Sequence, residues 1–169
     1  MIKNPSLLEK RLNAKEKENE QKIVVLVSGI MFILGFVIAG LNYRYKFIIL
    51  PDVVVIIGSI IFIISYILYG EVLRENTYLS RTIEVQKNQK VIDTGLYGIV
   101  RHPMYLTTVL LFLSITLILG SIISFIIFLI YPIIIFFRIK NEEIILKKNL
   151  IKYLEYMKKV KYRLIPFIW

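Results

Sequence analysis

The chain has 169 residues but no cysteine and only one histidine, His102. Without cysteine it can form no disulfide, thiolate metal site or thiol nucleophile, and a single histidine cannot build a histidine-rich metal site. We therefore predict that the protein binds no metal. Acidic residues are also scarce, because 12 Asp and Glu stand against 22 Lys and Arg, which leaves a formal net charge of +10.

Hydrophobic residues are abundant instead. They make up 57% of the chain, and the mean hydropathy is +0.68. Soluble domains are about 45–50% apolar, and disordered chains are poorer still in apolar residues. The composition therefore excludes an ordinary soluble domain and a disordered chain, and it indicates a small membrane protein.

Three segments contain no charged residue. Residues 23–41 and 53–70 are 19 and 18 residues long, close to the about 20 that a helix needs to cross a membrane. Residues 104–137 form a run of 34, which is too long for one span, and Gly120 and Ser121 near its middle are typical of a break between helices. We therefore predict an all-α integral membrane protein. Its four transmembrane helices lie at about 23–41, 53–70, 104–119 and 122–137, and the last two form a tight helical hairpin.

The basic residues are unevenly distributed around these segments. Six lie before residue 23, five between residues 70 and 104, and nine after residue 137, whereas two lie between residues 41 and 53. With four crossings, 20 of the 22 fall on one side of the membrane, and the positive-inside rule places that side in the cytoplasm. Both termini and the loop 71–103 are thus predicted to be cytoplasmic. Topology accounts for the positive charge, so nucleic acid is not an expected partner.

The predicted cytoplasmic parts differ in character. Residues 1–22 are predicted to form a charged helix that Asn4 caps. Residues 138–169 combine basic and apolar residues at helical spacing, which is typical of an amphipathic segment on an anionic membrane surface. Such a segment can also cover a cavity at the ends of the membrane helices.

The two ends of the predicted hairpin carry the residues of most chemical interest. Glu142 and Glu143 are adjacent carboxylates at an apolar boundary, where burial is costly unless a cation joins them. Arg138 lies one helical turn before Glu142 and shares its face. The cation is either Arg138, which would make a structural ion pair, or the amine or sulfonium of a ligand. The residues themselves leave both interpretations open.

His102 precedes Pro103, and a proline in the first turn of a helix is favourable. The histidine is therefore expected just outside the helix N-terminus, among unpaired backbone N–H groups that suit a ligand carboxylate. The alternative is a histidine that caps the helix or faces the lipid headgroups.

Several motifs together resemble one known family. The sequence GLYGIVRHPMY is followed by the predicted hairpin, an arginine, an EE pair, a Tyr-x-x-Tyr and an R-x-I-P ending. This combination resembles the isoprenylcysteine carboxyl methyltransferase family, which is related to the bacterial and eukaryotic phospholipid N-methyltransferases. The similarity covers roughly residues 76–166 and includes ENTYLSRTIEVQ before the loop.

The resemblance implies an integral membrane methyltransferase that uses S-adenosylmethionine, bound at the cytoplasmic ends of the last helices under the C-terminal segment. It implies that Arg138 is the catalytic residue and faces the substrate carboxylate, and that Glu142 holds the amino-acid or sulfonium end of the cofactor. The residues implied to bind the cofactor are Gln86, Val91, Ile92, Tyr97, His102, Pro103, Tyr105, Glu142 and Glu143.

We therefore predict methyl transfer to a lipophilic acceptor, with the carboxylate of an isoprenylcysteine-like molecule favoured because a carboxylate is already ionised at pH 7 and needs no base. The expected partners are this lipophilic small molecule and the lipids of a bacterial or archaeal cell membrane. Three alternatives remain: an N-methyltransferase acting on phospholipid amine headgroups, an NADPH-dependent sterol-type membrane reductase with a similar RHPxY motif, and a membrane interaction protein without enzymatic activity.

Overall fold

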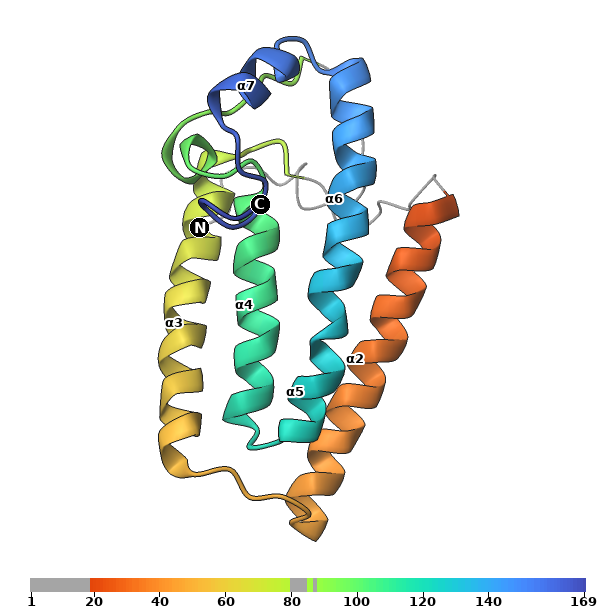
Figure 1. The fold of residues 1–169 in the computed structure, drawn as a ribbon, viewed down its shortest axis with the longest axis vertical. Helices are drawn as coiled ribbons and strands as arrows, with labels where there is room; N and C mark the ends of the chain where they lie inside the picture. The colour runs from red at the N-terminus through yellow and green to blue at the C-terminus, as the bar shows by residue number, and fades with distance from the viewer. Residues whose placement is uncertain (1–18, 80–84, 87) are drawn as a thin grey trace.

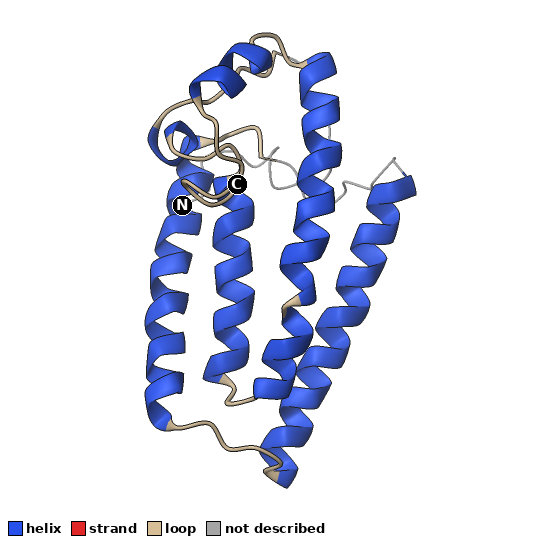
Figure 2. Cartoon of the chain, in the orientation of Figure 1, coloured by secondary structure: helices blue, strands red, loops and turns tan. Residues whose placement is uncertain are grey.

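The computed structural model describes residues 19–79, 85–86 and 88–169, and over these residues it contains helices and no strand (Figures 1 and 2). The predicted helix over 1–22 lies outside the described residues, except for its last residues, which begin α2. The elements in chain order are α2 (Asn19–Tyr45), α3 (Asp52–Glu75), the 3-10 turn η1 (Gly95–Gly98), α4 (Pro103–Ile118), α5 (Ile122–Phe128), α6 (Ile130–Asn149) and α7 (Tyr153–Lys159).

Three stretches of helix are long and apolar enough to cross a membrane: Lys22–Tyr45, Asp52–Glu75 and Ile122–Asn149. Most large apolar side chains of α2 and α3 are exposed, among them Ile33 at 67% and Ile67 at 64%, which is expected where lipid surrounds the helices. The described residues are therefore all-helical, as predicted, and three of the helical stretches suit a membrane protein. The third predicted span, 104–119, corresponds to α4, whose 16 residues reach about 24 Å, less than the about 30 Å of a hydrocarbon core.

The helices pack as two groups. Helix α3 lies along α4, and α2 lies against α5 and α6 (Figure 1). The close approach of α3 to α4 depends on Gly58, where a Cβ atom would lie 2.9 Å from the Cβ of Leu117. Gly120 turns the chain between α4 and α5 with a φ of +67°, a conformation that favours glycine. Beyond that turn α4 has few contacts with α6, so the predicted tight hairpin is not confirmed as a packed pair.

The last membrane segment begins at Ile122, as predicted, but differs from the prediction in its middle and at its C-terminal end. It divides at Leu129 into α5 and α6, because Pro132 has no N–H to bond the carbonyl of Phe128 one turn earlier. Helix α6 then continues to Asn149, well past the predicted end of the span at residue 137. Arg138, Glu142 and Glu143 are therefore carried on a continuous helix rather than on a separate C-terminal segment.

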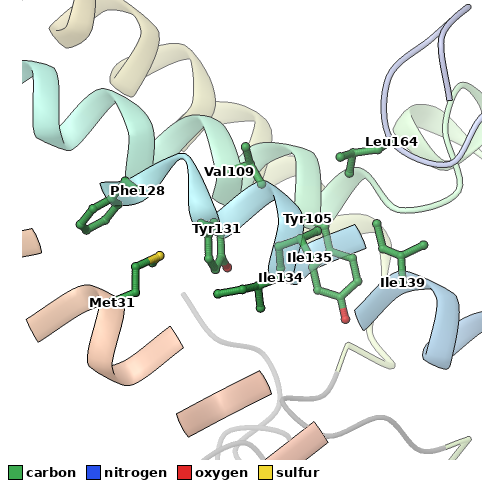
Figure 3. Close-up of a cluster of buried hydrophobic side chains, with 9 residues drawn as sticks. All are labelled: Met31, Tyr105, Val109, Phe128, Tyr131, Ile134, Ile135, Ile139 and Leu164. Carbon is green, nitrogen blue, oxygen red and sulfur yellow. The ribbon is translucent and has the colours of Figure 1, made fainter. Parts of the chain in front are cut away.

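The buried core lies between α2, α4 and α6 (Figure 3). Phe128 is fully buried there, and its ring fills the space that a side chain at Gly35 would need. The hydroxyl of Ser124 donates a hydrogen bond of 2.8 Å to the carbonyl of Gly35, which fixes α5 against α2. In Figure 3 the phenol oxygens of Tyr105 and Tyr131 point away from the α4 ribbon to the same side of the cluster.

This packing predicts that Gly35→Ala lowers stability. The new Cβ would lie 2.2 Å from a ring carbon of Phe128, so the buried ring must move, at a cost of about 1–3 kcal/mol. The measurement is thermal unfolding of the purified protein in detergent. Gly40→Ala is the matched control, because no described atom lies within 4 Å of its Cβ position. Alanine is also the better helix former, so equal melting temperatures for both variants would contradict the packing argument.

Candidate functional site

The segment RHPMY is held in place by backbone pairing at the end of the bundle where α4 begins. The N–H of Arg101 donates to the carbonyl of Tyr162 at 2.9 Å, and the N–H of His102 donates to the carbonyl of Arg163 at 2.9 Å. Pro103 then starts α4, as predicted, and is fully buried. The residues that flank the predicted hairpin therefore lie close together. The chain after α7 takes part in this contact as well as α6.

Glu143 is the buried centre of an ion-pair network. Its Oε1 accepts a hydrogen bond of 2.8 Å from Nε of Arg101, and its Oε2 accepts one of 3.0 Å from Nε of Arg163. The guanidinium of Arg101 also donates to the carbonyls of Val160 and Lys161, each at 2.8 Å. The side chains of Arg101 and Glu143 are 5% and 2% exposed, so both charges are compensated within the protein. One of the two adjacent carboxylates is therefore structural, and its partner is Arg101 rather than Arg138.

A pocket lies beside this network. Within the described part of the chain, three buried polar atoms on its walls have no hydrogen-bond partner: Nε2 of His102, Oε2 of Glu142 and the hydroxyl of Tyr153. Nδ1 of His102 lies 3.8 Å from Oε2 of Glu142, and Nε2 of His102 lies 3.4 Å from Oε1 of Glu143. Neither contact is a hydrogen bond. An unpaired buried polar group is costly. Three that face one cavity indicate a polar ligand that supplies the missing partners.

Helix α7 covers this pocket. The hydroxyl of Tyr156 donates a hydrogen bond of 2.7 Å to the carbonyl of Tyr97, and the amide of Asn76 donates to the Tyr97 hydroxyl at 3.0 Å. Burial raises the pKa of both tyrosines above the usual value of about 10, so their hydroxyls remain neutral at physiological pH. At the surface, Lys159 pairs with Asp93 at 2.7 Å and lowers the pKa of that carboxyl. The loop before α4 and the chain around α7 therefore cover the first pocket together.

A second pocket lies between α2, α3, α4 and α6, on the membrane side of the first. Its walls are mainly apolar, but Arg138 lines it, and Nε of Arg138 donates a hydrogen bond of 3.0 Å to the hydroxyl of Tyr105. Leu79, Met104 and Tyr105 line both pockets. The two pockets are thus neighbours that share Tyr105 as a wall.

The structure places the predicted site residues in three groups. Six line the first pocket: Val91, Ile92, Tyr97, His102, Tyr105 and Glu142. Arg138 lines the second pocket. Three predicted cofactor contacts are not among the lining residues: Pro103 is buried at the start of α4, Glu143 is held by the arginines, and the Gln86 side chain donates to the carbonyl of Tyr78 at 2.7 Å.

Several residues of the first pocket are not identified by the sequence alone. Asn76, Tyr153 and Tyr156 belong to the motifs ENTYLSRTIEVQ and Tyr-x-x-Tyr, which by themselves assign them no role. The positions of Leu146 and Leu150 in the sequence predict only the apolar face of an amphipathic helix. Their spacing gives a face but does not tell whether that face meets lipid or a cavity.

The ion-pair network predicts that the two adjacent glutamates differ in their effect on stability. Glu143→Ala leaves the buried Arg101 charge without its partner and is expected to cost about 3–5 kcal/mol, measured as a loss of melting temperature in detergent. Glu142→Ala is the matched control, since its unpaired Oε2 contributes no hydrogen bond, and it is expected to leave the melting temperature nearly unchanged or higher. A larger loss in Glu142→Ala than in Glu143→Ala would contradict this assignment.

Comparison with known proteins identifies the family. A family model described as phospholipid methyltransferase matches residues 47–152, from the connection between α2 and α3 to the turn after α6. The match includes the RHPMY segment, both glutamates and most of the two pockets. No curated protein matches the chain. Because the family model covers more than half of the 169 residues, the chain belongs to the phospholipid methyltransferase family of membrane methyltransferases, which act on lipid-like substrates.

Proposed function

We propose that the protein binds S-adenosylmethionine in the first pocket and transfers its methyl group to a lipophilic acceptor held in the second pocket. The observation that carries this proposal is the wall that the two pockets share. The first pocket, on whose walls three buried polar atoms have no hydrogen-bond partner, meets the second pocket among the membrane helices at Tyr105. Methyl transfer depends on the alignment of donor and acceptor, and such a junction can hold both.

The residues of the first pocket fit the proposed cofactor. The carboxylate of Glu142 suits the positively charged amine or sulfonium, and Nε2 of His102 suits the cofactor carboxylate. Val91 and Ile92 offer an apolar surface for the adenine ring. When bound, the cofactor supplies an electrophilic methyl group. Tyr153 and Tyr156 on α7 keep water away from that part of the site.

We further propose that the acceptor is a carboxylate of an isoprenylcysteine-like molecule. Arg138 is the reason, because a guanidinium among apolar walls can pair with a carboxylate in two hydrogen bonds. Tyr105 contacts Arg138 and orients it along the shared wall. The second candidate is the amine of a phospholipid headgroup, which the description of the matched family favours. An amine must lose a proton before it reacts, and the cation of Arg138 would repel its protonated form.

The proposed topology has four spans, with α4 as the short one, and both termini in the cytoplasm of a bacterial or archaeal cell. The support is the distribution of basic residues, 20 of 22 on one side. Helix α3 packs along the length of α4 and so limits the surface of α4 that lipid can contact. A soluble cofactor then reaches the first pocket from the cytoplasm, and a lipid reaches the second from the membrane.

The cofactor assignment predicts that S-adenosylhomocysteine raises the melting temperature of the purified protein and that NADPH does not. Tyr153→Phe is expected to weaken this binding about fivefold to tenfold, and Glu142→Gln about tenfold to a hundredfold, because they remove a neutral and a charged hydrogen-bond partner. Tyr66→Phe is the control, since Tyr66 is 65% exposed on α3 and lines neither pocket. Stabilisation by NADPH alone would favour the reductase, and no response to either compound would favour a non-enzymatic protein.

The acceptor assignment predicts the effect of Arg138→Gln. With radiolabelled S-adenosylmethionine, the variant is expected to raise KM for a prenylated thiol-acid about tenfold or more, because an ion pair within apolar walls is lost. Binding of S-adenosylhomocysteine should stay the same, since Arg138 does not line the first pocket. Methylation of lipid amine headgroups in place of the thiol-acid by the unmodified protein would overturn the carboxylate assignment.

A further inference from the structure

The second pocket has a defined depth. On α6 it extends from Arg138 to Tyr131, and seven residues of helix correspond to about 10 Å along the helix axis. On α2 it extends from Val24 to Phe32, which gives a similar length. Arg138 marks the end that meets the first pocket, and Phe32 and Tyr131 mark the opposite end.

Aromatic rings close that opposite end. The ring of Phe32 lies 4.6 Å from that of Phe112, 5.3 Å from that of Phe128 and 5.7 Å from that of Tyr131, measured between ring centroids. These rings belong to α2, α4, α5 and α6, so the cluster joins four helices. Of its members, Phe32 and Tyr131 face the pocket.

The close contact between α2 and α5 holds the aromatic cluster in place. Helix α2 approaches α5 closely because Gly35 has no side chain, and the ring of Phe128 occupies the space beside it. The hydrogen bond from Ser124 to the carbonyl of Gly35 fixes the two helices at this point. An occupant of the second pocket therefore cannot extend further between α2 and α5 unless the aromatic rings are removed.

We propose that Phe32 sets the length of the lipophilic tail that the second pocket accepts. An extended chain advances about 1.2 Å per bond, so a depth of about 10 Å holds a straight tail of roughly eight bonds between Arg138 and the aromatic floor. The inference rests on the proposed function, because it takes the acceptor head to lie beside Arg138 and the tail to point toward Phe32. Tails longer than this must bend or leave part of their length outside the pocket.

The test uses S-alkyl cysteine acids with straight tails from hexyl to hexadecyl on the full chain in detergent. Two readouts are taken for each tail: methyl transfer from radiolabelled S-adenosylmethionine, and the shift in melting temperature without any methyl donor. Phe32→Ala is expected to raise the ratio of kcat/KM for dodecyl over octyl about tenfold, which corresponds to roughly two more buried methylenes. The same substitution should move the largest thermal shift to a longer tail.

Phe36→Ala is the matched control. Phe36 lies one helical turn further along α2 and contacts the rings of Phe32 and Phe128, but it does not line the pocket. Its removal disturbs the same cluster without deepening the cavity, so the preferred tail should remain that of the unmodified protein. Gly29→Leu gives the opposite change. Gly29 lines the pocket with no described atom within 4 Å of its Cβ position, so a leucine fits there and is expected to favour shorter tails.

The two proposals fail in different ways. If no acceptor is methylated at any tail length, the proposed function is wrong, while the thermal shifts still report which tails bind. If methylation occurs but Phe32→Ala keeps the tail preference of the unmodified protein, the role of Phe32 is wrong. Should Phe32→Ala unfold, a failure of Gly29→Leu to shorten the preferred tail would overturn the inference equally. Equal use of octyl and hexadecyl tails by the unmodified protein would also overturn it.

Discussion

The carboxylate of Glu143 joins three parts of the chain that are far apart in sequence. It accepts hydrogen bonds from Arg101, just before α4, and from Arg163, after α7, while it is itself carried on α6. A buried carboxylate requires such compensation, because an uncompensated charge in an apolar setting costs several kcal/mol. Arg101 also donates hydrogen bonds to the carbonyls of Val160 and Lys161. This charge therefore helps to hold the chain around α7 over the first pocket, together with the hydrogen bond from Tyr156 to the carbonyl of Tyr97.

The unpaired polar atoms on the walls of the first pocket depend on that network. Because Glu143 is fully engaged, its neighbour Glu142 is free to present an unpaired oxygen to the cavity together with Nε2 of His102. The backbone of His102 is fixed by the carbonyl of Arg163, so its ring is held in position before any ligand arrives. Preorganisation of this kind reduces the free energy that binding must spend on ordering side chains.

The helix packing in turn determines where a lipophilic molecule can enter. Helix α3 pairs with α4, and α2 pairs with α5 and α6, and among the described helices the second pocket lies between these two groups. Gly58 permits the first pairing and Gly35 the second. Since α4 starts at the RHPMY segment, the same helix that borders the second pocket also carries residues of the first pocket.

The prediction of membrane helices from the sequence was accurate where charges bounded an apolar run, and it was least accurate around α6. The charges at Arg138 and Glu142 ended the apolar run but not the helix, because nothing from 133 to 149 breaks a helix and charged side chains continue it well. The pairing of helices was not predictable in this way. In lipid the packed face and the exposed face of a helix are both apolar, so periodicity carries little information about neighbours.

The sequence by itself determined the membrane class, the approximate position of the apolar helices and the two segments that hold the candidate site. These follow from runs of uncharged residues and from motifs, which are local properties of the chain. Only the tertiary structure decided that Glu143 is structural while Glu142 faces a cavity. Adjacent residues on a helix point about 100° apart, and only the positions of Arg101 and Arg163 show which side is which. It also decided that two pockets meet at Tyr105, because that junction is made by helices distant in sequence.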